Sequence, residues 1–413
     1  MQVLYDRCCG LDVHKKTVVA CVMVTSSDGQ VHKQVRTFGT TTMDLLTLAD
    51  WLASFQVNHV AMESTGIFWR PIFNLLEEGP TIILVNAQHM RAVPGRKTDI
   101  RDSEWLADLL RHGLLKASFI PAKVTRDLRD LVRYRKTLVQ ERAQEVNRLQ
   151  KVLETANVKL SSVVSDVLGK SGRRMVVAMI EGVSDAEALA DLARGSLRQK
   201  LPQLQEALQG QVGPHHRVLL RQIFAHILFL EDTIQQLQQE IEQQLCLFEE
   251  AFHLLLSIPG IQMIAAAAIL GEIGCDMSCF PSAKHLASWA GVCPGNKQSG
   301  GKRLSGQTTK GNTRLRALLI EVVWNISRMK DNYLSAQYHR LARRLGKKKA
   351  AMAVAHSLLV IIYHVLRDKQ PYSDLGADYF DSLDKERLTR QSIRRLEALG
   401  YAVSLTPKQE VVA

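Results

Sequence analysis

Short apolar runs rich in β-branched residues fill the N-terminal part of the chain, and they constrain its fold most strongly. Residues 17–24 (TVVACVMV) and 81–85 (TIILV) are the clearest of these runs. Residues 43–55 lie between them and place leucines at helical spacing. Strands that alternate with helices predict a mixed β-sheet with helices on its faces, an α/β fold. The expected strands cover residues 8–13, 17–24, 30–38, 59–62 and 81–85.

A helical pattern without strand signals follows from about residue 124 to residue 248. Its clearest part repeats an apolar side chain every three or four positions, at Ile223, Ile227, Leu230, Ile234, Leu237, Ile241 and Leu245. This spacing is typical of a coiled-coil seam. The partner of the seam is either residues 138–153 of the same chain, in a helical hairpin, or a second copy of the chain in a dimer. The sequence leaves both possibilities open.

The third region, residues 254–366, is expected to be mainly α-helical, with a Gly-, Ser- and Thr-rich loop over residues 291–312. Residues 351–366 form the longest uncharged apolar run, which is shorter than the ~20 residues that span a bilayer. We therefore expect a core helix there and no membrane association. The predicted organisation is a mixed-sheet α/β domain, a helical coiled-coil region, a mainly α C-terminal domain and a tail, at residues 1–120, 121–250, 251–370 and 371–413.

Positive charge is concentrated in the third region. The chain has 53 Lys and Arg against 41 Asp and Glu, a formal net charge of +12. Residues 294–349 contain fourteen of the basic residues and only two acidic ones, Glu321 and Asp331. Because clustered cations neutralise neighbouring phosphates, the distribution favours a nucleic-acid partner over an evenly solvated surface.

Cysteine usage and the N-terminus predict a cytoplasmic protein. The seven cysteines are an odd number and include no C-x-x-C pair, which argues against a disulfide framework and for a reducing compartment. The N-terminal MQVLYDRCCG lacks the apolar core of a secretory signal. We expect a cytoplasmic protein.

Four carboxylates occupy positions that could converge on one site. Asp12 stands at the end of the first expected strand, Glu63 at the end of another, and Asp99 and Asp102 at the start of a helix. Two residues three apart on a helix share a face. Oxygen ligands of this kind suit Mg²⁺ (or Mn²⁺), and bound metal can stabilise both oxygens of a phosphodiester displacement. Each acid alone is more often a surface residue or a helix cap.

Ser299 is the second candidate for chemistry. It is followed by Gly300, Gly301, Lys302 and Arg303, so a backbone can approach its hydroxyl closely between two cations. A serine in such a segment is more often part of a turn, and Ser305 offers the same chemistry. No histidine is near in sequence, so activation has to come from a metal or a remote base.

Taken together and in this order, the motifs GLDVHKK, AMESTG, KTDIRD, SIPGI and P-x-x-x-x-S-G-G-K-R resemble the Piv/MooV-type transposases of bacterial insertion sequences. The resemblance covers about residues 5–370. It implies an N-terminal RuvC-like (RNase H-like) domain with an Asp-Glu-Asp-Asp tetrad and a C-terminal transposase domain with a nucleophilic serine. It also implies a bacterial cytoplasmic protein associated with the nucleoid.

The resemblance also implies roles for individual residues and partners. Asp12, Glu63, Asp99 and Asp102 would hold Mg²⁺, and Ser299 would form a covalent 5′-phosphoserine link to DNA. The partners implied are donor and target DNA, a non-coding bridge RNA, and further copies of the chain in a dimer or tetramer, in which one subunit's tetrad approaches another's serine. Phosphate contacts are expected from Lys302, Arg303, Lys310, Arg314 and Arg316.

Two other functions compete with this interpretation. A metal-dependent endonuclease of the Holliday-junction type would use the tetrad with water as nucleophile and would form no covalent intermediate. A non-catalytic nucleic-acid-binding protein would need neither the tetrad nor the serine.

Overall fold

The computed structural model describes residues 3–26, 29–64, 66–85, 99–295, 297–383 and 385–404 of the chain. Within these, the description of residues 99–101, 297–299, 303–305, 385–388 and 391 concerns the backbone. The chain forms two compact units, Met1–Ile120 and Pro121–Ala413.

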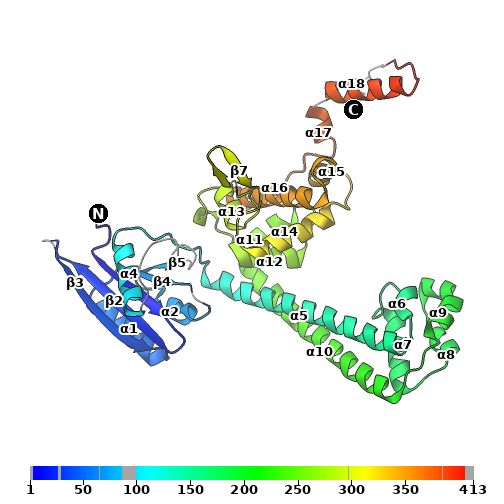
Figure 1. The fold of residues 1–413 in the computed structure, drawn as a ribbon, viewed down its shortest axis with the longest axis horizontal. Coiled ribbons are helices and arrows are strands. Elements are labelled where there is room, and N and C mark those ends of the chain that lie inside the picture. The colour runs from blue at the N-terminus through cyan, green and yellow to red at the C-terminus, as the bar shows by residue number, and fades with distance from the viewer. Residues whose placement is uncertain are drawn as a thin grey trace. The chain divides into compact units, whose positions relative to one another are not determined.

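The N-terminal unit is built on a mixed sheet, as the sequence predicts (Figure 1). Among its described residues, five strands are ordered β3-β2-β1-β4-β5. β1, β2 and β3 pair antiparallel, whereas β1, β4 and β5 run parallel. The elements are β1 (Arg7–Val13), β2 (Thr17–Thr25), β3 (Val31–Gly39), α1 (Thr42–Ser54), β4 (His59–Glu63), α2 (Trp69–Leu76), β5 (Thr81–Val85) and α4 (Asp99–Arg111).

The two faces of this sheet are covered by different helices. Leu11 and Met62 point to one face, where they are buried together with Leu48 of α1 and Ile72 of α2. The opposite face packs against α4 through a cluster that includes Cys8, Ala61, Ala107 and Leu110. Because side chains alternate along a strand, Gly10 and Asp12 lie on the α4 side with Cys8.

Gly10 allows α4 to approach β1 closely. A Cβ atom at this position would lie 2.2 Å from the carbonyl oxygen of Ser103 and 2.5 Å from the amide nitrogen of Ala107. Both distances are far below van der Waals contact, so the backbone of α4 occupies the space that a side chain would need. This contact fixes the height of α4 above the strand that carries Asp12.

The second unit is mostly helical (Figure 1). Its α-helices are α5 (Lys123–Thr155), α6 (Leu160–Val163), α7 (Lys170–Glu181), α8 (Ala186–Ala190), α9 (Leu201–Leu208), α10 (Pro214–Leu245), α11 (Glu249–Leu256), α12 (Met263–Ile273), α13 (Ala283–Trp289), α14 (Thr313–Ile326), α15 (Tyr333–Leu345), α16 (Lys347–Asp368), α17 (Tyr379–Leu383) and α18 (Lys385–Ala398). Short 3₁₀ turns cover Gly195–Lys200, Cys246–Phe248 and Met277–Cys279, and two strands are β6 (Lys297–Ser299) and β7 (Lys302–Ser305).

The two long helices α5 and α10 pack along each other in opposite directions (Figure 1). Arg135 of α5 bonds Gln238 of α10, and Arg142, further along α5, bonds the earlier Glu231 of α10. The two helices are therefore antiparallel. On the face predicted as a seam, Ile227 and other members are buried. The seam therefore packs within the chain, against α5. At the far end of the pair, α6 to α9 enclose a separate apolar core.

Helix α16 forms the centre of the C-terminal part. By length and composition it is the one described helix that could cross a membrane. It packs against α11, α13, α14 and α15, and side chains such as Leu358, Leu359 and Ile362 are fully buried there. It is therefore a core helix, as its apolar run predicts. The expected tail contains α17 and α18, and α17 packs on α15.

The expectation of a loop over residues 291–312 is wrong, because this segment contains the hairpin of β6 and β7. Gly300 and Gly301 connect the two strands with φ angles of +55° and +74°. Two consecutive residues with positive φ are the usual connection of a two-residue β-hairpin. The Gly-Gly pair between short polar runs was the sequence signal for this turn.

Gly10→Ala should destabilise the N-terminal unit by about 1–3 kcal/mol, because the added methyl group forces α4 away from β1. Gly79→Ala is the matched control, since its Cβ would be 3.5 Å from the nearest atom, and it should change stability by less than about 0.5 kcal/mol. Urea unfolding of the two variants and the wild type measures both effects. Equal stability of the two variants would contradict the close packing of α4.

Candidate functional site

Asp12 and Glu63 lie side by side at one edge of the N-terminal sheet. The parallel strands β1 and β4 pair Leu11 with Met62, so the next positions along both strands are Asp12 and Glu63. Neighbouring strands are about 4.8 Å apart, and residues in register point to the same face. The sequence prediction that strand ends bring acids together therefore agrees with the strand register at these two positions.

The start of α4 lies over the same edge. Cys8 donates from its Sγ to the carbonyl of Ala107, and Gly10 contacts both Ala107 and Ser103. α4 therefore runs opposite to β1, and its first turn lies towards the end of β1 that carries Asp12. Asp102 belongs to this turn and is partly buried. Asp99 begins the helix, but its side chain is outside the described part of the structure.

The side chain of Asp12 is 14% exposed, and its Oδ2 lies 3.1 Å from Nε2 of His14. Besides His14, the described side chains predicted as ligands at this edge are the carboxylates of Asp12, Glu63 and Asp102, which Mg²⁺ and Mn²⁺ prefer, so the donor chemistry fits a hard divalent cation. Among the residues whose side chains are described, no group of three or more Asp, Glu, His or Cys is close enough to hold an ion. Asp99 is not among those side chains.

In the second unit, Ser299 is the last residue of β6, directly before the turn of the hairpin. Its backbone pairs with Lys302 across the ladder, and its side chain is outside the described structure. Added Cβ atoms at Gly300 and Gly301 would meet nothing within 4 Å. The turn at the tip of the hairpin therefore has free space around both glycines.

Most of the predicted phosphate-binding cations belong to the hairpin or to the helix that follows it. Lys302, Lys310 and Arg314 are exposed. Arg316 is partly buried and donates from Nη1 to Oγ1 of Thr308 at 3.4 Å. Arg303 lies on β7, and its side chain is not among those described. These positions follow one another from the tip of the hairpin to the first turn of α14.

The base of the hairpin depends on two glycines that meet. A Cβ at Gly311 would lie 2.4 Å from the amide nitrogen of Gly291, and a Cβ at Gly291 would lie 2.9 Å from the carbonyl oxygen of Thr309. Backbone bonds from Thr309 to Cys293 and from Gly295 to Gln307 continue the ladder towards the tip. The two ends of the hairpin are thereby held together at the point where α14 begins.

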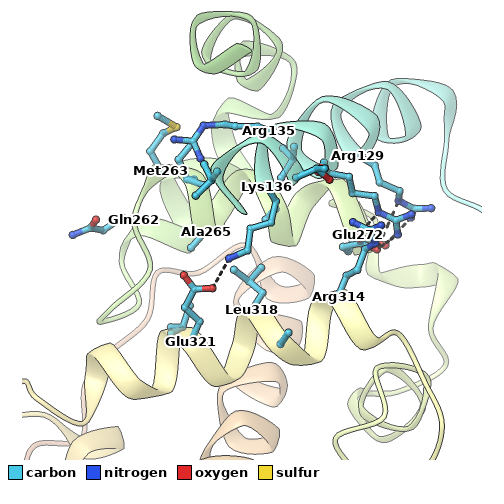
Figure 2. A pocket seen from close by; sticks show the side chains of 18 of the residues that line it. Arg129, Arg135, Lys136, Gln262, Met263, Ala265, Glu272, Arg314, Leu318 and Glu321 are labelled. Atoms are coloured by element: carbon cyan, nitrogen blue, oxygen red, sulfur yellow. Dashed lines mark hydrogen bonds and ion pairs between the residues drawn. The ribbon is translucent and has the colours of Figure 1, made fainter. Parts of the chain in front are cut away.

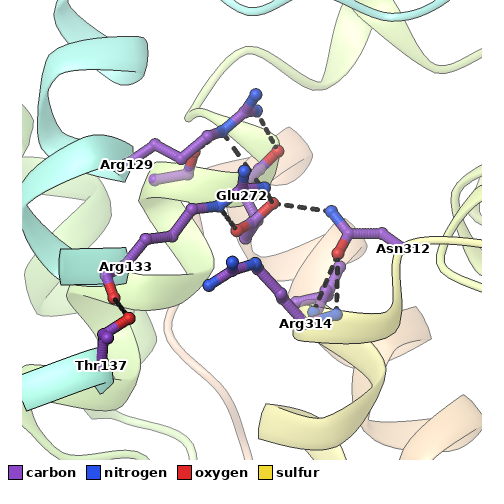
Figure 3. Close-up of polar contacts among 8 residues, drawn as sticks. Arg129, Arg133, Thr137, Glu272, Asn312 and Arg314 are labelled. Carbon is purple, nitrogen blue, oxygen red and sulfur yellow. Dashed lines mark hydrogen bonds and ion pairs between the residues drawn. The ribbon is translucent and has the colours of Figure 1, made fainter. Parts of the chain in front are cut away.

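A buried carboxylate connects this base to the long helix α5 (Figure 3). Glu272 of α12 is 5% exposed and accepts two hydrogen bonds from Arg133, at 2.7 and 2.8 Å. Nδ2 of Asn312 donates to Oε2 of the same carboxylate at 2.6 Å. Arg129 adds bonds to the backbone carbonyls of Gly271 and Glu272. Because Asn312 also accepts from the amides of α14, the network joins three helices.

The same contacts set the ionisation of Glu272. Burial raises the pKa of its carboxyl group, but the hydrogen bonds from Arg133 and Asn312 and the charges of Arg133 and Arg129 lower it by more. The pKa therefore lies below the ordinary value of 4.5, and the group stays ionised at neutral pH. Two arginines and an amide stabilise the buried charge.

Sequence reasoning missed this network. Its signal was present, since Glu272 is an isolated acid in the otherwise apolar stretch 263–273, and a buried acid requires a partner. The partners Arg129 and Arg133 are about 140 positions away in the chain, so the sequence did not reveal which cations meet it.

The cysteines show no comparable site. All seven lie in described residues and are free. Burial raises the pKa of Cys8 and Cys21 to about 12, which keeps both as neutral thiols. Cys275 and Cys279 are exposed.

Two family models match the chain. The model of the DEDD domain of IS110 elements, described as a transposase, matches residues 9–158. The model described as the transposase IS116/IS110/IS902 family matches residues 252–339. The first range contains all four predicted acids, and the second contains Ser299. The resemblance to Piv/MooV-type transposases inferred from the motifs is confirmed.

Proteins of insertion sequences and a gene-inverting protein are similar in sequence to this chain. The transposase for insertion sequence element IS1111A of Coxiella burnetii is 23% identical, over 78% of this chain and 81% of its own length. An uncharacterised protein of insertion element IS900 from Mycobacterium paratuberculosis is 25% identical, over 70% of this chain and 80% of its own. The pilin gene-inverting protein of Moraxella bovis is 34% identical, over 34% of this chain and 45% of its own.

Glu272→Gln should lower stability by roughly 1–3 kcal/mol at neutral pH, because Arg133 loses its buried countercharge. Since the folded pKa of Glu272 is depressed, its contribution is complete above about pH 4.5 and is lost as the pH falls through the lower folded value. The difference between wild type and variant, measured by urea unfolding, should therefore shrink below pH 4.5. A difference that stays constant from pH 7 to pH 3 would refute this.

Asn312→Asp should keep the cap of α14, because Asp is as good an N-cap as Asn, but it places a carboxylate against Glu272. A loss of about 1–3 kcal/mol is expected. In the double variant with Glu272→Gln, the amide at position 272 can donate to the carboxylate at position 312. The hydrogen bond is thus restored with donor and acceptor exchanged, and much of the lost stability should be recovered. A double-mutant cycle from urea unfolding measures the coupling, and strictly additive effects would show that the two side chains do not interact.

Proposed function

We propose that this chain, which belongs to the transposases of IS110-type insertion sequences, cuts and joins DNA strands through Ser299, assisted by metal-binding carboxylates. The observation that carries the proposal is the open tip of the β6–β7 hairpin, where Ser299 precedes two glycines with free space around them. A nucleophile that attacks a phosphodiester in DNA needs such access, because the strand approaches as a continuous backbone.

In the proposed reaction, the Ser299 oxygen forms a bond to a phosphorus atom of DNA, and the bond from that phosphorus to the 3′-oxygen breaks. The serine proton ends on the departing 3′-oxygen, so a 3′-hydroxyl and a 5′-phosphoserine result. Attack by the 3′-hydroxyl of another strand reverses the same step and releases Ser299. The energy of the phosphodiester bond is kept in the intermediate, so joining requires no further cofactor.

The carboxylates at the sheet edge form the other half of the proposed site. Asp12 and Glu63, in register on neighbouring strands, and Asp99 and Asp102, in the first turn of α4, would hold the metal. Mg²⁺ or Mn²⁺ bound there supplies positive charge for the negative charge that develops on the phosphoryl oxygens. Following the family resemblance, we propose that the acids of one subunit serve the serine of another.

The cations around the hairpin are proposed to hold the DNA strand. Lys302 lies across the ladder from Ser299, Arg303 follows it, and Lys310, Arg314 and Arg316 continue along the base and into α14. Cations at these positions would fix the register of the DNA backbone and would neutralise part of the negative charge on the phosphate that Ser299 attacks.

A non-coding bridge RNA and a dimer or tetramer complete the proposal. The concentration of basic residues in 294–349 supports a second nucleic-acid partner besides DNA. The long helix α10 exposes apolar side chains, among them Phe229 at 64% and Val218 at 56%, that a further copy of the chain would cover.

Ser299→Ala should abolish strand exchange and the covalent adduct, because no other group carries the reacting oxygen, while affinity for DNA stays within about twofold. The adduct is captured on a nicked suicide substrate and seen as a protease-sensitive band on a denaturing gel. Ser305→Ala, on the opposite strand of the same hairpin, is the matched control and should keep the band. An adduct formed by Ser299→Ala would remove this serine from the role.

The same assay separates the competing functions. Cleavage that persists in Ser299→Ala, without any adduct, would support the endonuclease that uses water. Full activity in cells with Asp12→Asn and Glu63→Gln would support a non-catalytic binder. The proposal predicts that both acid variants lose strand exchange and retain DNA binding.

A further inference from the structure

A cavity of about 750 Å³ lies between α5, α12 and α14 in the second unit (Figure 2). Its size is in the range of ordinary ligand sites and is much larger than a single small anion requires. Apolar residues such as Val132, Ala268 and Leu318 form part of its lining. None of its lining residues belongs to the β6–β7 hairpin. Arg314 lines the cavity and is also among the cations proposed to hold the DNA strand, so the cavity adjoins the proposed serine site and lies outside its hairpin.

Positive charge predominates in the lining. Two acidic residues, Glu272 and Glu321, face a larger set of basic ones, Arg129, Arg133, Arg135, Lys136 and Arg314. Glu272 is already bonded to Arg133, and Lys136 reaches across the cavity to Glu321 at 2.8 Å, as Figure 2 shows. Arg129 bonds the backbone carbonyls of Gly271 and Glu272 and adds its charge to the stabilisation of Glu272, so Arg135 and Arg314 are the lining cations that remain for an anionic ligand.

Arg135 has the strongest requirement for such a ligand. Its Nη2 donates to Oε1 of Gln238 at 3.0 Å, but its Nε is buried and makes no hydrogen bond. Within the described part of the chain, no carboxylate pairs with it. Burial lowers the pKa of this guanidinium, in keeping with the loss of water around its charge. An anion in the cavity would satisfy both the charge and the unused donor.

The first turn of α12 adds a second source of positive potential. Gln262 is its N-cap residue and makes no side-chain capping bond, and the first turn contains no acidic residue. Gln262, Met263, Ile264 and Ala265 all line the cavity. The amide groups of a helix start point outwards and attract anions. The N-terminus of α14 contributes less, because Asn312 already accepts from two of its amides.

We infer that this cavity is a second DNA-binding site of the transposase, which holds the phosphodiester backbone of duplex DNA away from the reacting bond. A backbone suits it better than a single small anion, because Arg135, Arg314 and the start of α12 come from three different helices around a cavity of about 750 Å³. DNA is the polyanion on which the chain acts, and contacts of this kind fix a duplex in position without reading its sequence.

The inference rests on DNA being the substrate and not on the chemistry of Ser299. If Ser299→Ala retained the covalent adduct, the serine assignment would fail and this site would be unaffected. If the variants below bound DNA normally, this site would fail and the serine assignment would be unaffected.

Ala265→Glu tests the site with opposite effects on folding and binding. Position 265 is in the first turn of α12, where an acid stabilises the helix, so the unfolding midpoint should stay the same or rise. The added carboxylate also repels a phosphate and neutralises a lining cation. Affinity for a duplex of about 30 base pairs, measured by fluorescence anisotropy at ~0.1 M salt, should fall about tenfold. Ala265→Gln, of the same size and uncharged, should stay within about twofold.

Arg135→Gln tests the cavity from α5. If Arg135 contacts a phosphate, the slope of log affinity against log salt should become shallower by about 0.9. Lys151→Gln is the matched control, because Lys151 is exposed on the same helix and lies outside the cavity. It should leave the slope unchanged.

Three results would overturn the inference. The first is equal affinity of Ala265→Glu and Ala265→Gln for duplex DNA. The second is an equal change of salt slope for Arg135→Gln and Lys151→Gln. The third is a loss confined to a single-stranded RNA probe of the same sequence, which would assign the cavity to RNA. A loss for duplex DNA in Ala265→Glu, with an unchanged or raised unfolding midpoint, is the result that the inference predicts.

Discussion

The pairing of the buried Glu272 carboxylate is the interaction on which the C-terminal part depends. A charge removed from water is tolerated when its partners are in place, and removal of one partner leaves an uncompensated charge. Glu272 receives Arg133 from α5 and Asn312 from the start of α14 at once. The same Asn312 caps α14 and stands one residue after Gly311, where the two ends of the hairpin meet. Glu272 of α12 thus connects the long helix α5 with the start of α14 and with the hairpin segment that contains Ser299.

In the N-terminal unit, strand pairing and close backbone packing position the candidate site residues. Parallel pairing of β1 and β4 puts Asp12 and Glu63 in neighbouring positions, and the missing side chain of Gly10 lets α4 approach until its first turn lies over the same edge. Backbone register and a close helix contact therefore determine where the acids lie, and ion pairing determines where the serine hairpin begins. The proposed reaction needs both, because metal-held charge and the nucleophile have to act on the same phosphodiester.

Much of this could be predicted from the sequence, and the parts that could not be predicted are those that a local apolar pattern does not mark. Strands and helices with a strong apolar period, such as 17–24 and the face through Ile227, were located correctly because local pattern determines them. The order of motifs identified the family. The hairpin at 297–305 was missed because its strands are short and polar and only the Gly-Gly turn marks it. The partners of Glu272 were missed because they come from α5, far away in the chain, and local periodicity carries no information on such pairs.

The central claim is that the acids of the sheet edge and the hairpin of Ser299 act at one DNA phosphodiester. Iron-directed cleavage tests it most directly, with Fe²⁺ in place of Mg²⁺ and ascorbate as reductant in the DNA-bound protein, because radicals formed at the metal cut nearby polypeptide. The account predicts backbone cuts near residues 12, 63 and 99–102 together with cuts near residue 299, all lost in Asp12→Asn. Cuts confined to the acidic strands, with the hairpin intact in the DNA complex, would contradict it.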